Sequence, residues 1–358
     1  MKILLLADYY QEYLNQFYQK NDCRDFKYQQ HLDHLIDDYF GSFGSYYRHL
    51  QKLGHQVFLV IGNDYQLQNK WVSENSLPMQ ACLVSKKKIV LEQIRKFSPD
   101  IVFMGSMFDY YGEFLKEVSG VTKNIFTWIA CPIPTDLDYS HVKCVLSSTS
   151  FYVGKFKNLG LNSHKLGAGF DNDIPSKLIQ DNPKYDLSFI GGFSPKTHAN
   201  RVKIIRGLIS KNIKIDLFGY GLKKPIFFWQ DKTLYNLYHG QLWGLSMYQT
   251  LHDSLISLNI HIDVAGGFAG NMRMYEATGC GSLLFTEMTD NLPQIFDIKK
   301  EVVGYKGEDD LEEKLRYFLN NPEEAKIIAD NGKKACHENF GYNKRAVELT
   351  QIFTQYAL

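Results

Sequence analysis

Short apolar runs alternate with amphipathic helical segments along this chain, and that alternation limits its fold more than any other feature of the sequence. The apolar runs 2–7 and 57–61 flank a segment in which Tyr47, Leu50 and Leu53 recur at helical spacing. A glycine then ends the predicted helix, since glycine accepts the left-handed conformation that closes many helices. A buried strand, a helix and another buried strand in this order predict a parallel sheet of the doubly wound α/β type.

A second series with the same order begins after a polar interruption. Residues 171–184 are polar, contain proline and show neither helical nor strand spacing, which suits a connection between domains. Apolar strands are predicted at 186–192, 213–221 and 256–262, with a helix between the first two. We therefore expect a second Rossmann-like domain, because 358 residues are enough for two domains with separate cores.

These patterns predict three segments. The first is an N-terminal Rossmann-like domain over 1–172, and the second is a C-terminal one over 184–340. The last segment, 341–358, is predicted to be a helix that crosses back to the first domain. In such an arrangement the carboxyl ends of both sheets line a cleft, where a donor held by one domain meets an acceptor held by the other.

Composition excludes several classes of protein. Hydrophobic residues make up 44% of the chain and charged residues 22%, which is ordinary for a globular protein and argues against disorder. The 40 Lys and Arg residues nearly balance the 39 Asp and Glu residues. A dedicated nucleic-acid binder would carry a strongly basic face, so we expect no nucleic-acid partner.

The aromatic residues, 14% of the chain, gather between residues 9 and 47. This segment lengthens the connection that follows the first strand, and long connections in compact domains are usually functional lids or insertions. One interpretation is that it shapes an acceptor site on the N-terminal domain. The alternative is a helical insertion whose rings pack on the body of that domain.

Cysteine usage and the N-terminus bear on the cellular compartment. The six cysteines show no Cys-x-x-Cys pair and no histidine-rich spacing typical of zinc sites, so we interpret them as reduced thiols of a cytoplasmic protein. The apolar run before Asp8 is too short for a signal peptide, and no later run is long enough to span a membrane. Peripheral contact with the inner face of a membrane stays open.

The stretch 264–287 combines a glycine-rich turn, a short helix and a buried strand. Its glycines, among them Gly270, let the backbone approach a ligand, and a helix from Asn271 would offer unpaired N–H groups to phosphate. Arg273 can neutralise a diphosphate, and Glu276, one turn later, can accept hydrogen bonds from a ribose diol. The alternative is an ordinary surface ion pair between the two side chains.

The C-terminal part of the chain resembles the glycosyltransferase group 1 pattern, and most closely its CgeB-like branch. In that pattern an Arg-x-x-Glu helix is followed by Gly-x-x-Leu and a strand, and the matching residues are Arg273, Glu276, Gly281 and Leu284, with the resemblance continuing to Phe353. The resemblance implies a GT-B fold, in which two Rossmann-like domains face a central cleft and the C-terminal one binds a nucleotide sugar. The larger group has a second Glu eight positions earlier, where this chain has Phe268. This departure leaves the sugar-hydroxyl contact and the retaining mechanism without support.

Other donor-binding residues are expected at the ends of the remaining strands of the second domain. A Gly-Gly turn precedes a predicted helix, where open backbone N–H groups and two cations could contact the diphosphate. Glycines that end the next strand lie where a nucleobase commonly binds. The alternatives are plain turns, solvated cations and a histidine buried in the core. The predicted residues outside the 264–287 stretch are Gly192, Lys196, Arg201, Gly219, Gly221 and His261.

Two aspartates of the first domain are candidates for a catalytic base. Asp8 follows the first strand and Asp109 follows a later one, so both lie at the carboxyl edge of the predicted sheet. The donor phosphate could serve as base instead if the reaction retains the anomeric configuration. Asp136 and Asp138 form an Asp-x-Asp pair, which we interpret as chance, and we expect no metal.

The sequence therefore predicts a glycosyltransferase that moves a sugar from a nucleoside diphosphate, UDP or GDP, to a hydroxyl acceptor. The acceptor could be a glycan, a lipid-linked molecule or another alcohol, and the expected role is synthesis of a bacterial surface glycan, with no further cofactor. A nucleotide-sugar epimerase and a catalytically silent sugar-binding protein are the alternatives. A nicotinamide-dependent dehydrogenase is disfavoured, because the first strand lacks a Gly-x-Gly-x-x-Gly turn.

Overall fold

The computed structural model of the chain describes residues 1–76, 85–105, 107–131, 137–180, 183–194, 198–221, 232–261 and 267–357. The chain divides into two compact units. Unit 1 comprises Met1–Gly167 and Tyr342–Leu358, and unit 2 comprises Ala168–Gly341. The division between them falls earlier than the predicted end of the first domain at residue 172.

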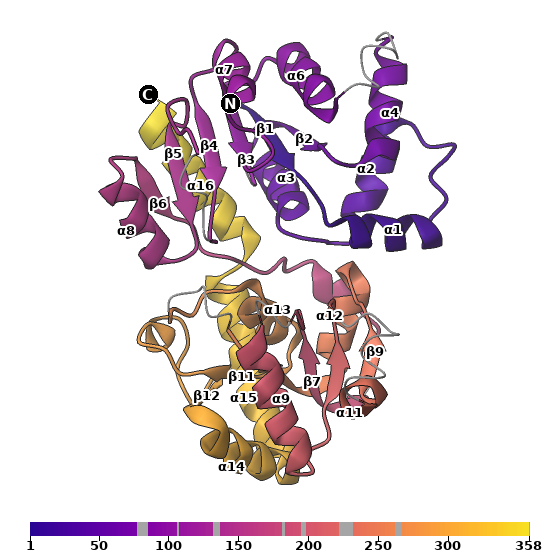
Figure 1. Cartoon of the computed structure of the whole chain (residues 1–358), viewed down its shortest axis with the longest axis vertical. Coiled ribbons are helices and arrows are strands. Elements are labelled where there is room, and N and C mark those ends of the chain that lie inside the picture. Colours follow the sequence, from indigo (N-terminus) through magenta and orange to yellow (C-terminus); the bar gives the residue numbers. More distant parts are fainter. Residues whose placement is uncertain are drawn as a thin grey trace. The chain divides into compact units, whose positions relative to one another are not determined.

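Unit 1 is built on a parallel sheet flanked by helices (Figure 1). In the described part of the chain the sheet has six strands in the order β2-β1-β3-β4-β5-β6. The elements are β1 (Lys2–Ala7), α1 (Gln11–Lys20), α2 (Tyr28–Ile36), α3 (Phe43–Lys52), β2 (Gln56–Ile61), α4 (Tyr65–Glu74), α6 (Lys86–Phe97), β3 (Ile101–Met104), α7 (Glu113–Ser119), β4 (Ile125–Trp128), β5 (Cys144–Ser147), α8 (Ser150–Asn158), β6 (Ser163–Lys165) and α16 (Tyr342–Ala357).

Side chains on successive strand residues face opposite sides of this sheet, and each side has its own helices. Val102 and Met104 of β3 share an apolar cluster with residues of α6 and α7. Phe103, between them, packs instead on Phe43 of α3 and Phe353 of α16, with ring centroids 5.3 and 5.8 Å apart. The first and last segments of the chain therefore share one unit, and Figure 1 shows both termini in it.

The aromatic segment 9–47 folds into α1, α2 and the start of α3. Most of its rings are buried, and they pack on one another: the Tyr13 and Phe40 rings stack with centroids 3.8 Å apart, and Tyr9 meets the edge of Phe40 at 5.0 Å. Tyr10 is a solvent-exposed exception. Packing therefore accounts for most of the aromatic excess, and a role in acceptor binding stays a prediction.

Unit 2 is a second parallel sheet with the strand order β12-β11-β10-β7-β8-β9, again six strands among the described residues. Because both sheets are parallel throughout and flanked by helices, the predicted doubly wound α/β fold is confirmed. The elements are the 3-10 turn η1 (Ile174–Lys177), β7 (Tyr185–Ile190), α9 (Ala199–Ser210), β8 (Asp216–Phe218), α11 (Lys232–Asn236), β9 (Tyr238–Gly240), α12 (Gly244–His252), β10 (Ser254–Asn259), α13 (Met272–Cys280), β11 (Leu283–Glu287), the 3-10 turn η3 (Leu292–Gln294), β12 (Val303–Tyr305), α14 (Gly307–Asn320) and α15 (Pro322–Asn339).

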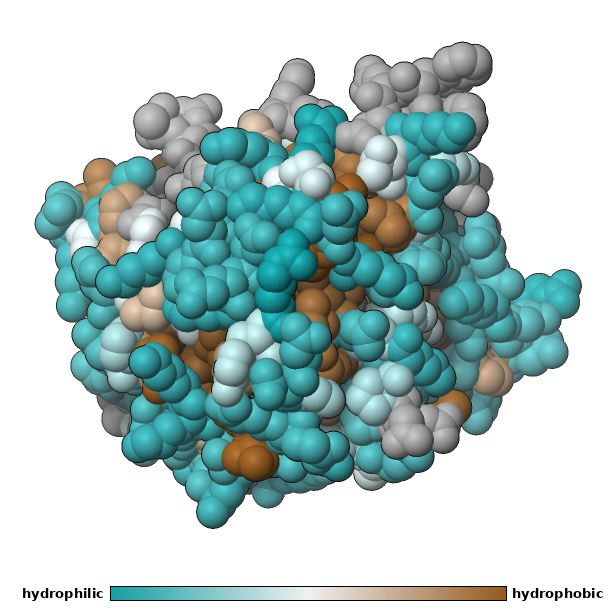
Figure 2. All heavy atoms as spheres, turned by 90° about the horizontal axis from the view of Figure 1, so that it is seen from below, coloured by the Kyte–Doolittle hydropathy of each residue, from teal (hydrophilic) through white to brown (hydrophobic). Residues whose placement is uncertain are grey.

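The core of unit 2 lies between one face of this sheet and the helices α9, α14 and α15. Leu187, Leu258 and Phe285 contribute to it from three neighbouring strands. The surface seen from below in Figure 2 is mostly hydrophilic, and hydrophobic side chains show in recesses between the polar ones. No helix in the described ranges is both long and apolar enough to cross a membrane.

Candidate functional site

The predicted donor residues of unit 2 follow strands that are neighbours in the sheet. β10, β7 and β8 lie side by side and run in the same direction, so the loops after them emerge at one edge. Gly192 follows β7, Gly219 and Gly221 follow β8, and His261 follows β10. The parallel topology therefore brings together residues that are far apart in the sequence, as predicted for a ligand site.

The loops after β7 and β8 fit against each other through glycine. Gly219 has a φ of +133°, and a Cβ atom built on it would lie 1.8 Å from the Gly191 carbonyl oxygen. A Cβ on Gly192 would lie 2.7 Å from His198 and 2.9 Å from Tyr220. A larger residue at position 219 would thus push the two loops apart at the backbone, whereas one at position 192 would displace the His198 and Tyr220 side chains.

Arg201, on α9, ties two of these loops together from inside. Its Nη1 donates to the Gly192 carbonyl at 2.9 Å and its Nη2 donates to the Ile260 carbonyl at 2.8 Å. The side chain is buried over the Phe189 ring, and burial lowers the pKa of the guanidinium to about 10. These contacts make Arg201 a residue that positions the loops. Its predicted contact with a diphosphate is not among them.

The glycine-rich loop before α13 is fixed by a residue that sequence reasoning missed. The side-chain amide of Asn291 accepts a hydrogen bond from Ala269 N and donates one to Ala269 O, each at 2.8 Å. Gly267 and Gly270, with φ of +77° and +153°, supply the turns on either side. Asn291 lies in a polar run after β11, and its place after a strand is the only sequence signal that could have indicated it.

A chain of polar side chains connects this loop to the sheet. The side chain of Asn271 donates to Asn259 at 2.7 Å, Asn259 donates to Thr286 at 3.0 Å, and the Thr286 hydroxyl lies 3.2 Å from Nε2 of His261. Burial, with a smaller effect from the Arg201 charge, lowers the pKa of His261 to about 4. The imidazole is therefore neutral near pH 7, and it takes part in the network as a hydrogen-bonding group.

Arg273 and Glu276 form an ion pair at the start of α13, with Nη1 and Oε2 3.0 Å apart. Glu276 is buried, which raises its pKa, while the Arg273 charge and a hydrogen bond from Tyr248 oppose that shift. Nε and Nη1 of Arg273 are also buried, and neither makes a hydrogen bond with a described residue. The surface ion pair considered as the alternative is thus not what the fold builds, since both side chains are largely enclosed.

Two predicted residues of this region cannot be placed. Lys196 lies outside the described residues, as does Gly266 of the glycine-rich turn in the stretch 264–287. The others form two groups around neighbouring strand ends: the glycine loops with Arg201, and the α13 start with Asn271, Arg273 and Glu276. The Asn271 network and the Arg201 bond to Ile260 both reach the end of β10, which joins the groups.

In unit 1, the two predicted base candidates share a cation. Nζ of Lys86 lies 3.0 Å from the Asp8 carboxylate and 3.1 Å from that of Asp109. Tyr110 donates a further hydrogen bond to Asp8 at 2.8 Å. Asp8 is mostly enclosed, whereas the side chain of Asp109 is 62% exposed. Lys86, which sequence reasoning missed, therefore holds both carboxylates at one edge of the sheet.

The described residues contain no group of three or more His, Cys, Asp or Glu side chains that could hold a metal ion. Asp136 of the Asp-x-Asp pair lies outside these residues, and Asp138 accepts hydrogen bonds from Ser140 in a local turn. The five described cysteines form no disulfide, and Cys82 is not described.

The family model that matches this chain covers most of unit 2. Residues 201–351 match the family model described as glycosyl transferase-like. This segment contains the Arg273–Glu276 pair, the loop before it and most of unit 2. No curated protein matches the chain.

Solved structures with a similar fold cover both units. A glycosyltransferase from Rickettsia africae ESF-5 is 12% identical with a TM-score of 0.63, over 99% of this chain and 98% of that one. AviGT4, a glycosyltransferase involved in avilamycin A biosynthesis, is 16% identical with a TM-score of 0.62, over 100% and 98%. HepE from Anabaena, solved in complex with UDP, is 11% identical with a TM-score of 0.61, over 99% and 100%.

These similarities define the class of fold. The chain has the GT-B fold of two parallel-sheet α/β units, as expected. Its second half carries a segment of the glycosyl transferase-like type. The match supports a glycosyltransferase at that level, and nothing in it distinguishes the CgeB-like branch.

Proposed function

We propose that the protein is a glycosyltransferase that moves a sugar from a nucleoside diphosphate, held by unit 2, to a hydroxyl acceptor. The observation that carries this proposal is the buried Arg273–Glu276 pair directly after a glycine-rich loop, within the glycosyl transferase-like segment. A buried guanidinium whose Nε makes no hydrogen bond with a described residue, at the edge of a parallel sheet, is suited to an anionic ligand.

The start of α13 supplies the anion-binding part of this site. Asn271 precedes the helix; its side-chain nitrogen donates to Asn259, and its side-chain oxygen makes no capping bond to the helix. The first N–H groups of the helix are therefore left for the diphosphate, with Arg273 one residue into the helix. Glu276 keeps oxygen lone pairs beyond its bonds to Arg273 and Tyr248, and in this proposal they accept from a ribose hydroxyl.

For the nucleobase we propose the loop after β8. Tyr220 is 39% exposed there, and its ring stacks on that of Trp243 with centroids 6.1 Å apart and planes 16° from parallel. An exposed flat ring suits base stacking. HepE has been solved with UDP and with UDP-glucose, which makes uridine nucleotides the first donors to test.

The acceptor site and the base are proposed for unit 1. Asp109 is more accessible than Asp8, and both are anchored by Lys86. Replacing each by Asn separates their roles: the base is the one whose loss abolishes transfer while nucleotide binding persists. The anomeric configuration of the product, read by NMR, decides whether a base is needed at all.

The remaining expectations are part of the same proposal. We expect a cytoplasmic enzyme of surface glycan synthesis that works without a metal ion, because helix N–H groups and Arg273 stabilise the leaving diphosphate. Activity that persists in excess chelator would support metal independence, and activity that returns only on adding a divalent cation would contradict it.

Thermal unfolding with added nucleotides tests the donor site. A nucleotide that binds the folded state raises the midpoint of unfolding by mass action. We expect UDP or GDP to do so, and we expect Arg273→Met to abolish the shift. Arg24→Met removes an equally charged side chain from an exposed position in unit 1 and is expected to leave the shift unchanged.

Three other outcomes have defined meanings. No shift with UDP, GDP, CMP or ADP would contradict the donor site. A full shift in the Arg273→Met variant would show that nucleotides bind elsewhere. Nucleotide binding without transfer to any of a wide panel of acceptors would favour the silent binding protein, and conversion of the donor sugar without an acceptor would favour the epimerase.

A further inference from the structure

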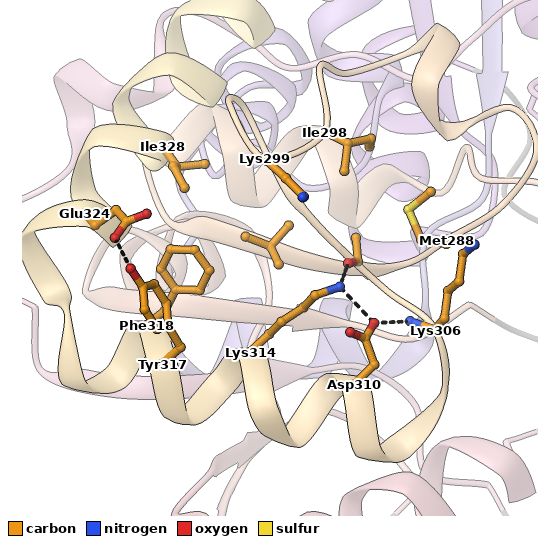
Figure 3. A pocket seen from close by; sticks show the side chains of 12 residues that line it. Met288, Ile298, Lys299, Lys306, Asp310, Lys314, Tyr317, Phe318, Glu324 and Ile328 are labelled. Atoms are coloured by element: carbon orange, nitrogen blue, oxygen red, sulfur yellow. Dashed lines mark hydrogen bonds and ion pairs between the residues drawn. The ribbon is translucent and has the colours of Figure 1, made fainter.

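Unit 2 has a cavity that contains none of the predicted donor residues. It measures about 450 Å³ and lies beside β12, the edge strand of the sheet (Figure 3). Small-molecule sites usually measure roughly 300–1,000 Å³, so this cavity is large enough for a ligand. Its walls come from α14, from the start of α15 and from the segments on either side of β12.

Gly304, in the middle of β12, leaves room for the Met288 side chain at the cavity wall. A Cβ atom at this position would lie 2.1 Å from the sulfur of Met288 and 3.6 Å from Ile298. The absence of a side chain lets Met288 lie across the strand. Together with Val303, Phe318 and Ile328, these residues give the cavity its apolar walls.

The charged residues of the lining are three lysines and two acids. Figure 3 shows Lys306 and Lys314 on the side of Met288, Lys299 near Ile298, and Phe318, Ile328 and Glu324 toward the other side. Apolar side chains and lysine ammonium groups are therefore interspersed around the cavity, so a ligand with an apolar body and an anionic end has partners for both parts.

Both acidic side chains of the lining already have partners. Asp310 accepts from Lys314 Nζ at 2.8 Å and from Lys306 N at 2.6 Å, and these bonds outweigh burial and lower its pKa. Glu324 accepts from the Tyr317 hydroxyl at 2.6 Å. Neither acid therefore forms an ion pair with the ammonium group of Lys299 or Lys306.

Lys299 and Lys306 have exposed side chains, and neither ammonium makes an ion pair with any residue in the described ranges. Lys299 also has a φ of +72°, a conformation that costs free energy for a residue with a side chain. Its backbone N–H bonds to Val302 O at 2.8 Å, so the turn is fixed with this lysine at the mouth of the cavity.

We propose that this cavity binds an amphiphile with an alkyl body and one anionic head group, such as a carboxylate or a phosphate monoester. The alkyl part lies against Met288, Ile298, Val303, Phe318 and Ile328, and the head group is held by Lys299 and Lys306. The site is separate from the proposed donor site and does not depend on the glycosyltransferase function.

Calorimetric titration with decanoate tests the proposal in the full-length protein. We expect saturable binding, at least tenfold weaker for the double variant Lys299→Glu, Lys306→Glu. Lys326→Glu makes the same charge change on an exposed position of α15 outside the cavity and should bind like the unchanged protein. Ile298→Gln, which places an amide in the apolar wall, should also weaken binding while the lysines are intact. Circular dichroism of each variant without ligand checks that unit 2 is folded.

Two binding measurements distinguish a free amphiphile from a membrane lipid as the ligand. Binding of decanoate in solution assigns the site to free amphiphiles. Binding to vesicles that contain phosphatidic acid, lost in the double variant and absent for phosphatidylcholine vesicles, assigns it to membrane lipids. The proposal is wrong if neither probe binds, if the double variant binds as well as the unchanged protein, or if decyltrimethylammonium binds as tightly as decanoate.

Discussion

At the scale of single residues, the structure separates groups available to a ligand from groups that hold the protein together. Arg201 and Arg273 are both cations predicted to contact a diphosphate. Arg201 donates from both terminal nitrogens to backbone carbonyls, whereas Arg273 pairs through Nη1 with the Glu276 carboxylate at the start of a helix. Sequence spacing could not distinguish the two arginines, because the partners of Arg201 are backbone carbonyls brought close only by folding.

Arg201→Met should destabilise unit 2 by about 2–4 kcal/mol. The change leaves two buried carbonyls without their charged donor, and hydrogen bonds to charged groups contribute about 1.5–3 kcal/mol each. Lys203→Met on the same helix removes an exposed ammonium and should change stability by no more than about 0.5 kcal/mol. Urea unfolding followed by fluorescence measures both, and equal effects would contradict the positioning role.

His261 should make unit 2 less stable as the pH falls from 6.5 to 4. Burial lowers its pKa to about 4 from the ordinary 6.5, so the unfolded state binds more protons in this window. The contribution is complete above pH 6.5 and is lost progressively toward pH 4. Burial also lowers the pKa of His31 in unit 1 to about 4, so this residue likewise makes its unit less stable as the pH falls.

His261→Gln should therefore flatten the pH dependence of the unfolding free energy without removing it. His141→Gln, in the other unit, serves as the control and should leave the dependence as it is. Urea unfolding at several values between pH 4 and 7 provides the measurement. An unchanged slope in the His261 variant would show that its imidazole is not held neutral by the fold.

At the scale of elements, the distance between neighbouring loops decides at which positions only glycine fits. Gly219 follows β8 and Gly240 ends the adjacent β9, and both have positive φ, but only at Gly219 would an added Cβ meet another loop. A Cβ on Gly240 meets nothing within 4 Å. The sequence shows glycines at both positions and gives no indication of this difference.

Gly219→Ala should cost about 3 kcal/mol or more, because the methyl group strains the backbone and also meets the Gly191 carbonyl. Gly240→Ala is a matched control with the strain alone, for which about 1 kcal/mol is expected. Chemical unfolding gives both values. The nucleotide-induced thermal shift should be lost only in the Gly219 variant, and similar costs for the two would contradict the close-approach argument.

At the scale of the whole molecule, the chain ends in the unit where it begins. Phe353 of α16 is fully buried against Phe103 and Phe126, with ring centroids 5.8 and 4.8 Å away. The last helix is therefore part of the core of unit 1, although the segments just before it in the sequence belong to unit 2.

Phe353→Ala should destabilise unit 1 by about 3–5 kcal/mol, the usual cost of emptying a buried phenylalanine site. Hydrogen exchange should show faster exchange in β3 and β4 but unchanged protection in β7 and β10. Val347→Ala, on the exposed side of the same helix, should have little effect. Loss of protection in unit 2 alone would mean that α16 stabilises the other unit.

The sequence by itself determined the fold class, because alternating apolar strands and amphipathic helices have one economical solution, the parallel sheet covered by helices. It also indicated the stretch around Arg273 and Glu276, since glycines and charged residues at helical spacing are local features. Only the tertiary structure decided what each side chain contacts. Residues from separate segments meet in the hydrogen-bond network from Asn271 to His261 and in the bonds of Asn291 to Ala269. The same is true of the ion pairs of Lys86 and of the cavity beside Gly304. Such contacts depend on strand order and on distances of a few ångströms, which no local pattern encodes.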